Sequence, residues 1–133
     1  MGNVNLLAVF LGAAAFFAIG ALWYGVIFGK AWQKATGLTE EQLKGGANMP
    51  LIFGTCFVLE FIVVLTYGHM VDFLAPSDHA KLMIATGFGL AIMSPAIGIT
   101  YLYMRKPLKL FLIDAGHFVV GMAAVGGVFV LLG

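Results

Sequence analysis

The sequence predicts an all-α, polytopic membrane protein with four transmembrane helices in a single domain, residues 1–133. Hydrophobic residues make up 62% of the chain and charged residues only 10%, a composition that excludes an ordinary soluble domain. Four apolar stretches are each close to or above the ~20 residues that cross the hydrocarbon core of a bilayer. They occupy nearly the whole chain, so any functional site must lie between helices or between subunits.

The four predicted spans cover residues 6–28, 51–70, 82–104 and 108–132. Small residues recur at helical spacing in the first and third spans, a pattern that lets a neighbouring helix approach closely. These helix-packing candidates are Ala14, Ala18, Ala21, Gly25 and Gly29 in the first span and Gly87, Ala91 and Gly98 in the third. Such seams serve contacts within one subunit or between subunits, and their number favours a homo-oligomer.

The first connection, residues 30–49, contains a predicted short amphipathic helix at about residues 39–44. Thr39 followed by Gln42 three residues later is typical of a capping box. Pro50 then begins the second span at a position that tolerates its missing N–H. We expect this connection to lie in the cytoplasm, where it is the candidate surface for a protein partner.

Basic residues are distributed unevenly between the connections. Lys30, Lys34 and Lys44 lie in the first connection and Arg105, Lys106 and Lys109 in the third, whereas the second carries only Lys81. The positive-inside rule therefore predicts cytoplasmic first and third connections and places both termini on the non-cytoplasmic side. The lipid bilayer is the expected surrounding of the chain. A net charge of +1 gives no indication of nucleic-acid binding.

Three ionisable residues lie well inside the predicted spans, away from the span ends: Glu60, Asp114 and His117. Charge in hydrocarbon is costly, so function is expected at these positions. Glu60 lies ten residues after Pro50 and His117 ten after Pro107, which predicts that both are about 15 Å from the cytoplasmic boundary. Asp114 precedes His117 by three positions, so the two share one face of the fourth span.

Three interpretations of these residues stay open. They form a structural hydrogen-bonded contact between helices, or they exchange protons or bind a small cation. In the third, Asp114 and His117 bind Zn²⁺ or another divalent metal with Glu60 as a third ligand. No other cofactor is predicted.

Polar residues elsewhere in the spans have simpler interpretations. Ser94, Cys56 and Tyr67 are candidates for lining a cavity, and Pro95 beside Ser94 predicts a bend in the third span. Trp23 and Tyr24 near the end of the first span are expected in the aromatic belt at the membrane interface.

The run Trp23-Tyr24-Gly25 through Phe28-Gly29-Lys30-Ala31-Trp32, followed by Gly37-Leu38-Thr39-Glu40-Glu41, resembles a family of short bacterial four-helix membrane proteins catalogued as a domain of unknown function. The similarity in length and segment order covers essentially the whole chain, whereas the motif is confined to the region of the first connection. The resemblance implies a four-helix fold and a multi-pass protein of the bacterial inner (plasma) membrane. It supplies no catalytic residues.

The leading functional hypothesis is a small transport or channel bundle in which Glu60 and His117 handle protons or a small cation. The alternative is a non-catalytic membrane module that binds a partner through residues 30–49, with the embedded polar residues purely structural. An enzyme is less favoured, because the sequence has no Ser-His-Asp arrangement, phosphate loop or H-E-x-x-H motif.

Overall fold

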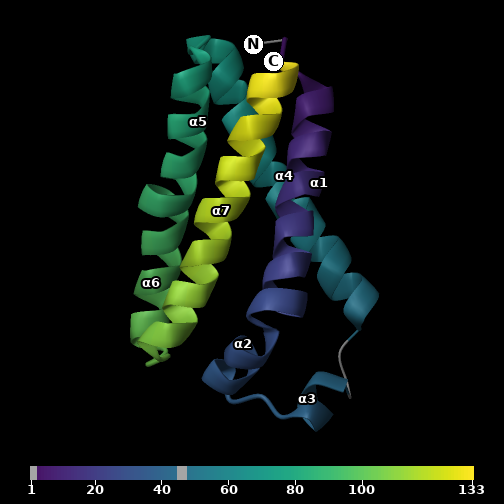
Figure 1. Cartoon of the computed structure of the whole chain (residues 1–133), viewed down its shortest axis with the longest axis vertical. Coiled ribbons are helices and arrows are strands. Elements are labelled where there is room, and N and C mark those ends of the chain that lie inside the picture. Colours follow the sequence, from purple (N-terminus) through teal and green to yellow (C-terminus); the bar gives the residue numbers. More distant parts are fainter. Residues whose placement is uncertain (1–2, 45–47) are drawn as a thin grey trace.

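The computed structural model describes residues 3–44 and 48–133, and every regular element among these residues is helical. Four helices are long and apolar enough to cross a membrane: Leu6–Ile27, Met49–Leu74, Asp78–Tyr103 and Leu108–Leu132. The chain ends lie at the same end of the bundle (Figure 1), where the Asn5 amide donates to the Leu132 carbonyl oxygen at 2.9 Å. The predicted all-α, four-span class is confirmed.

The first span consists of α1 (Leu6–Leu22) and the π-helix η1 (Trp23–Ile27), after which α2 (Gly29–Thr36) continues toward the connection. The Phe28 N–H donates to the Trp23 carbonyl oxygen at 2.7 Å, the five-residue spacing that defines a π-helix. A Cβ on Gly29 would clash with the carbonyl oxygen of Tyr24. Gly29 is therefore required by the local turn from η1 into α2.

The predicted capping box of the first connection is present. The Thr39 N–H donates to Oε1 of Gln42 at 2.8 Å, and the Gln42 N–H donates to Oγ1 of Thr39 at 3.1 Å. With Thr39 at the cap, the short helix α3 covers Glu40–Lys44. Residues 45–47 of the predicted partner-binding segment lie outside the described residues.

The second span, α4 (Met49–Leu74), is longer at both ends than the predicted 51–70. It begins earlier because the Asn48 side chain caps it, accepting a hydrogen bond from the Leu51 N–H at 3.2 Å. Only Val64, Tyr67 and Gly68 of α4 are buried, and the helix runs obliquely behind α1 and away from α7 at its first half (Figure 1).

The third span consists of α5 (Asp78–Gly87), the π-helix η2 (Phe88–Met93) and α6 (Ser94–Tyr103). It begins before the predicted residue 82 because Ser77 caps α5, accepting from the Ala80 N–H at 3.2 Å. The π-helix η2 ends two residues before Pro95. The bend expected at Pro95 stays a prediction. Pro95 lies in the first turn of α6, and its missing N–H removes one backbone bond to the preceding turn.

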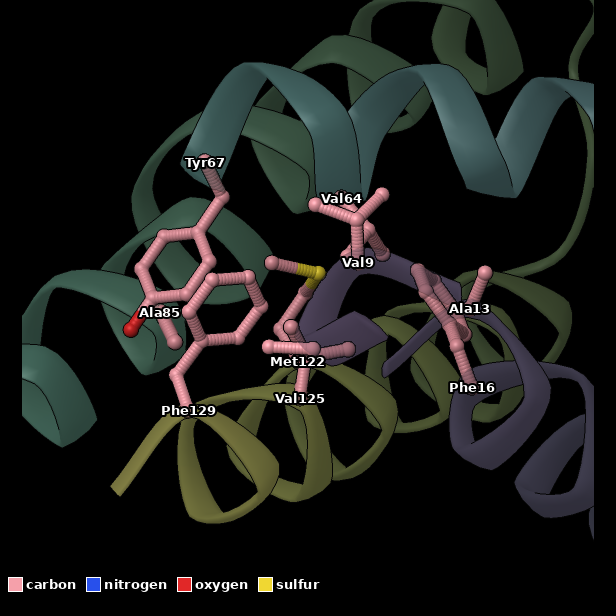
Figure 2. Packing of buried hydrophobic residues seen from close by; sticks show 10 residues of the cluster. Val9, Ala13, Phe16, Val64, Tyr67, Ala85, Met122, Val125 and Phe129 are labelled. Carbon is pink, nitrogen blue, oxygen red and sulfur yellow. The ribbon is translucent and has the colours of Figure 1, made fainter. Parts of the chain in front are cut away.

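The fourth span, α7 (Leu108–Leu132), has the largest buried share of the four. It packs on α1, α5 and η2, and the hydrophobic core forms between these helices and α4. In Figure 2 the ring of Tyr67 from α4 points toward Phe129 of α7, and the two ring centroids are 4.9 Å apart. Val9, Val64, Met122 and Val125 extend the core.

Most of the small residues predicted to pack against a neighbouring helix do not do so within the chain. Ala14, Ala18 and Ala21 of α1 and Gly25 of η1 are exposed. The small residues of α1 that face α7 are Gly12 and Gly20. In the third span, Ala91 is exposed and Gly87 has open space at its Cβ position, whereas Gly98 contacts the ring of Phe111. Contacts of the exposed stripes with a second copy stay a prediction.

Candidate functional site

The acid and the histidine in the middle of the fourth span are buried in the bundle. Asp114 and His117 are each 6% exposed and lie one turn apart on α7. The structure joins them to side chains from the first and third spans. We call Asp114, His117, Trp23, Tyr24 and Tyr101 the Asp114 cluster.

The Asp114 carboxylate is held by two tyrosine hydroxyls. Tyr24 of η1 donates to Oδ1, and Tyr101 of α6 donates to Oδ2. Each carboxylate oxygen therefore has a donor, which reduces the cost of burying an acid within a membrane span. Through this one side chain, the first, third and fourth spans are tied together.

The π-helix explains why two neighbouring residues both reach α7. Tyr24 bonds Asp114, and Nε1 of Trp23 donates to the Ile113 carbonyl oxygen at 2.8 Å. Successive side chains of an α-helix diverge by about 100°. The wider turn of a π-helix reduces this angle. Gly116 leaves room for the indole, because a Cβ there would lie 2.8 Å from Cζ2 of Trp23.

The imidazole of His117 has an unsatisfied nitrogen. Its Nε2 is buried and has no hydrogen-bond partner among the residues that the structure describes. This nitrogen faces α1 at Gly20, where a Cβ would lie 3.0 Å away. Aromatic rings surround the imidazole, with centroids at 5.3 Å for Phe16, 5.1 Å for Tyr24 and 5.2 Å for Phe118. A buried polar atom without a partner costs stability and is expected where function requires it.

Glu60 lies on α4, across α1 from the Asp114 cluster. It is half-buried, and its Oε2 is buried without a hydrogen-bond partner within residues 3–44 and 48–133. Phe57, one turn before Glu60, packs on Phe17 at 5.9 Å. Val64, one turn after it, is the nearest side chain to Gly12. Glu60 is therefore level with residues 12–17 of α1.

The expectation that Glu60 and His117 share one depth does not hold. His117 meets α1 at Gly20, so the two residues differ by about 8 Å along the α1 axis at 1.5 Å per residue. The reason is the oblique path of α4 (Figure 1). Equal residue counts from Pro50 and Pro107 measure depth only when the two helices are parallel and start at the same height.

The metal-binding interpretation requires Asp114, His117 and Glu60 to lie close together. Within residues 3–44 and 48–133, no group of three His, Cys, Asp or Glu side chains is arranged to hold a metal ion. Asp114 and His117 alone do not make the three-ligand set, because Glu60 lies on the other side of α1.

The three cavity-lining candidates occupy different environments. Ser94 lines a groove of about 390 Å³ between the third and fourth spans, and its hydroxyl donates to the Gly89 carbonyl oxygen at 2.6 Å. Cys56 is exposed on α4. Tyr67 is fully buried in the core, with its hydroxyl donating to the Lys81 carbonyl oxygen at 2.6 Å.

Sequence reasoning missed the residues that hold Asp114. It assigned Trp23 and Tyr24 to the interfacial belt, and it gave Tyr101 no partner. A signal was present, since the two spans that lead into basic connections both carry tyrosine close to their ends. That signal is not selective, because Tyr103 lies near the same end and is 87% exposed.

The fold and the Asp114 cluster define a four-span α-helical membrane protein with a polar cluster buried between its spans. The chain belongs to the family described as "Protein of unknown function (DUF1761)", whose model matches residues 7–130. The predicted membership of an uncharacterised family is confirmed. No curated protein and no solved structure shows significant similarity to the chain.

Proposed function

We propose that this protein handles protons within the membrane, as a small transport or channel bundle in which Asp114 and His117 exchange protons. The observation that carries this proposal is the unpartnered, buried Nε2 of His117 one turn from a carboxylate held by two hydroxyls. Carboxyl and imidazole groups within spans are the components of membrane proton relays. A purely structural contact would give each of these groups a partner.

The two tyrosines suit a carboxyl group that gains and loses a proton. An ionised Asp114 only accepts hydrogen bonds, and it accepts from Tyr24 and Tyr101. A protonated Asp114 must also donate one, and a tyrosine oxygen can accept it. The cluster therefore offers hydrogen bonds to Asp114 in both protonation states.

Glu60 is proposed as a second proton-binding group. Its depth differs from that of His117, and a path across a hydrocarbon core of about 30 Å needs groups at more than one depth. Its buried Oε2 has no hydrogen-bond partner among the described residues. We assign Glu60 to the part of the path nearer the chain termini.

The proposed location is the plasma membrane of a bacterium, with the first and third connections in the cytoplasm and both termini outside. The distribution of Lys and Arg supports this orientation. Fusion of a periplasm-active reporter to either end should give activity, whereas a cytoplasm-dependent fluorescent reporter should be dark. The opposite result at both ends would reverse the orientation.

Proton flux into liposomes tests the function. Purified protein is reconstituted with a pH-sensitive dye inside, and a potassium diffusion potential drives protons inward. The wild-type chain should acidify the lumen, and Asp114→Asn should reduce the rate at least ten-fold, an effect of the size seen when a proton-transfer group is lost. Asp78→Asn is the matched control, because that side chain is 69% exposed at the bundle end. Equal rates for Asp114→Asn and the control would refute the proposal.

Partner binding through residues 30–49 is a second candidate, favoured by one observation. The reciprocal Thr39–Gln42 bonds stabilise a short helix whose described side chains are exposed. Substituting Glu40 and Glu41 with Gln should abolish co-purification of a partner while proton flux persists. Unchanged co-purification would remove this candidate.

A further inference from the structure

A groove lies between the third and fourth spans. It measures about 390 Å³, within the range of about 300 to 1,000 Å³ typical of small-molecule sites. Its lining comes from η2, α6 and α7 and includes Leu90, Pro95, Leu112, Ala115, Gly116 and Val119. None of the lining residues is charged, and the Ser94 hydroxyl is already bonded to a backbone carbonyl. The groove therefore suits an apolar chain.

Exposed cations lie at one end of this groove. Lys109 precedes Leu112 by three residues and Gly116 by seven, so the three share a face of α7. The distance from Lys109 to Gly116 along the axis is about 10 Å. Arg105 is exposed in the turn between α6 and α7, and its φ of 56° is a conformation usually taken by glycine. An arginine is present here despite the backbone cost.

We propose that this groove binds an anionic phospholipid, with one acyl chain along α7 and the phosphate at Arg105 and Lys109. Charge complementarity selects the headgroup, because a zwitterionic lipid would bring its own cation close to these two side chains. The acyl chain accounts for the apolar groove, which a free phosphate would leave unfilled. This site does not depend on the proposed proton exchange.

Trp23 provides a reporter on the groove. It contacts Gly116, which lines the groove, since a Cβ there would lie 2.8 Å from the indole. The chain has two tryptophans, so Trp32→Phe leaves Trp23 alone. This variant is reconstituted in phosphatidylcholine vesicles that contain a brominated lipid, either phosphatidylglycerol or phosphatidylcholine with bromine on an acyl chain. The bromine atoms quench indole fluorescence on contact.

The brominated phosphatidylglycerol should reach half-quenching at a mole fraction about thirty-fold lower than brominated phosphatidylcholine, the factor expected for two basic residues at an anionic headgroup. Arg105→Gln with Lys109→Gln should remove this preference. The matched control is Lys30→Gln with Lys34→Gln, which removes the same charge from exposed positions on α2 at the same end. Both pairs are exposed, so both variants should fold.

Three outcomes would overturn the proposal. Equal quenching by the two brominated lipids would show ordinary contact with surrounding lipid. Equal loss of the preference in both double variants would show a diffuse surface charge in place of a site. Glycerol phosphate in solution should leave quenching unchanged, and relief of quenching by it would show that the headgroup alone determines binding.

Discussion

The Tyr24 hydroxyl donates a hydrogen bond to the carboxylate of Asp114, ninety residues later in the chain. The bond joins the first span to the fourth, and Tyr101 adds the third span from the opposite oxygen. Three spans thus meet at a single buried acid. Substitutions in this cluster should therefore affect both the stability of the bundle and its proton chemistry.

Removing one hydroxyl should destabilise the bundle. Tyr24→Phe and Tyr101→Phe each delete a hydrogen bond to a buried carboxylate, a change expected to lower the free energy of unfolding by about 1.5 to 3 kcal/mol. The double variant should deviate from additivity, because both bonds end on one carboxylate. Denaturant titration in detergent measures these values. Tyr103→Phe, at an 87% exposed position, should have no effect; an equal loss there would contradict the assignment.

The π-helix should depend on a glycine beside it. In Gly29→Ala the new methyl meets the Tyr24 carbonyl oxygen, so η1 must rearrange and move Trp23 away from the Ile113 carbonyl oxygen. In a Trp32→Phe background, the emission maximum of Trp23 should shift. Gly25→Ala is the control within η1 itself, because its Cβ position is open. An unchanged spectrum for Gly29→Ala would contradict the role of Gly29.

Alanine substitutions at two glycines of the third span should have different effects on stability. Gly89 lies against the α7 backbone, where a Cβ would be 2.5 Å from the carbonyl oxygen of Phe118. Gly89→Ala should cost about 1 to 3 kcal/mol of stability through overpacking. Gly87→Ala, with open space at its Cβ, should be neutral or stabilising by up to about 1 kcal/mol from helix propensity. Equal melting temperatures for the two variants would contradict the close contact between Gly89 of η2 and the backbone of α7.

Replacing Glu60 should raise the stability of the bundle and lower its proton flux. Its Oε2 is buried without a partner, so Glu60→Leu should raise the free energy of unfolding by about 1 to 3 kcal/mol, the cost of an unsatisfied buried polar group. The same variant should lower proton flux in liposomes. A destabilised variant would indicate that Glu60 has a partner in the bilayer, and unchanged flux would remove Glu60 from the proton path.

The spans and the buried face of the fourth helix were predictable because they rest on strong signals. Apolar length marks a span, and the spacing of Asp114 and His117 places them on one face. The cap at Thr39 was also predictable, since it acts through bonds to a residue three positions away. These features depend on residues close together in the chain.

Features that depend on a distant helix were not predictable. The first span is apolar around its whole circumference, so its sequence does not show that Gly12 and Gly20 face α7 while Ala14 and Ala18 are exposed. The π-helix η1 has no sequence signature, and it turns Tyr24 inward to Asp114. The tilt of α4, which offsets Glu60 from His117, is set by tertiary packing.

Infrared difference spectroscopy of the reconstituted protein tests proton exchange at Asp114 most directly. The spectrum is recorded across a change in pH for the wild-type chain, Asp114→Asn and His117→Gln. The account predicts a carboxylic acid C=O band that is absent in Asp114→Asn and an imidazole band that is absent in His117→Gln. Wild-type spectra without either band, or bands that persist in both variants, would contradict it.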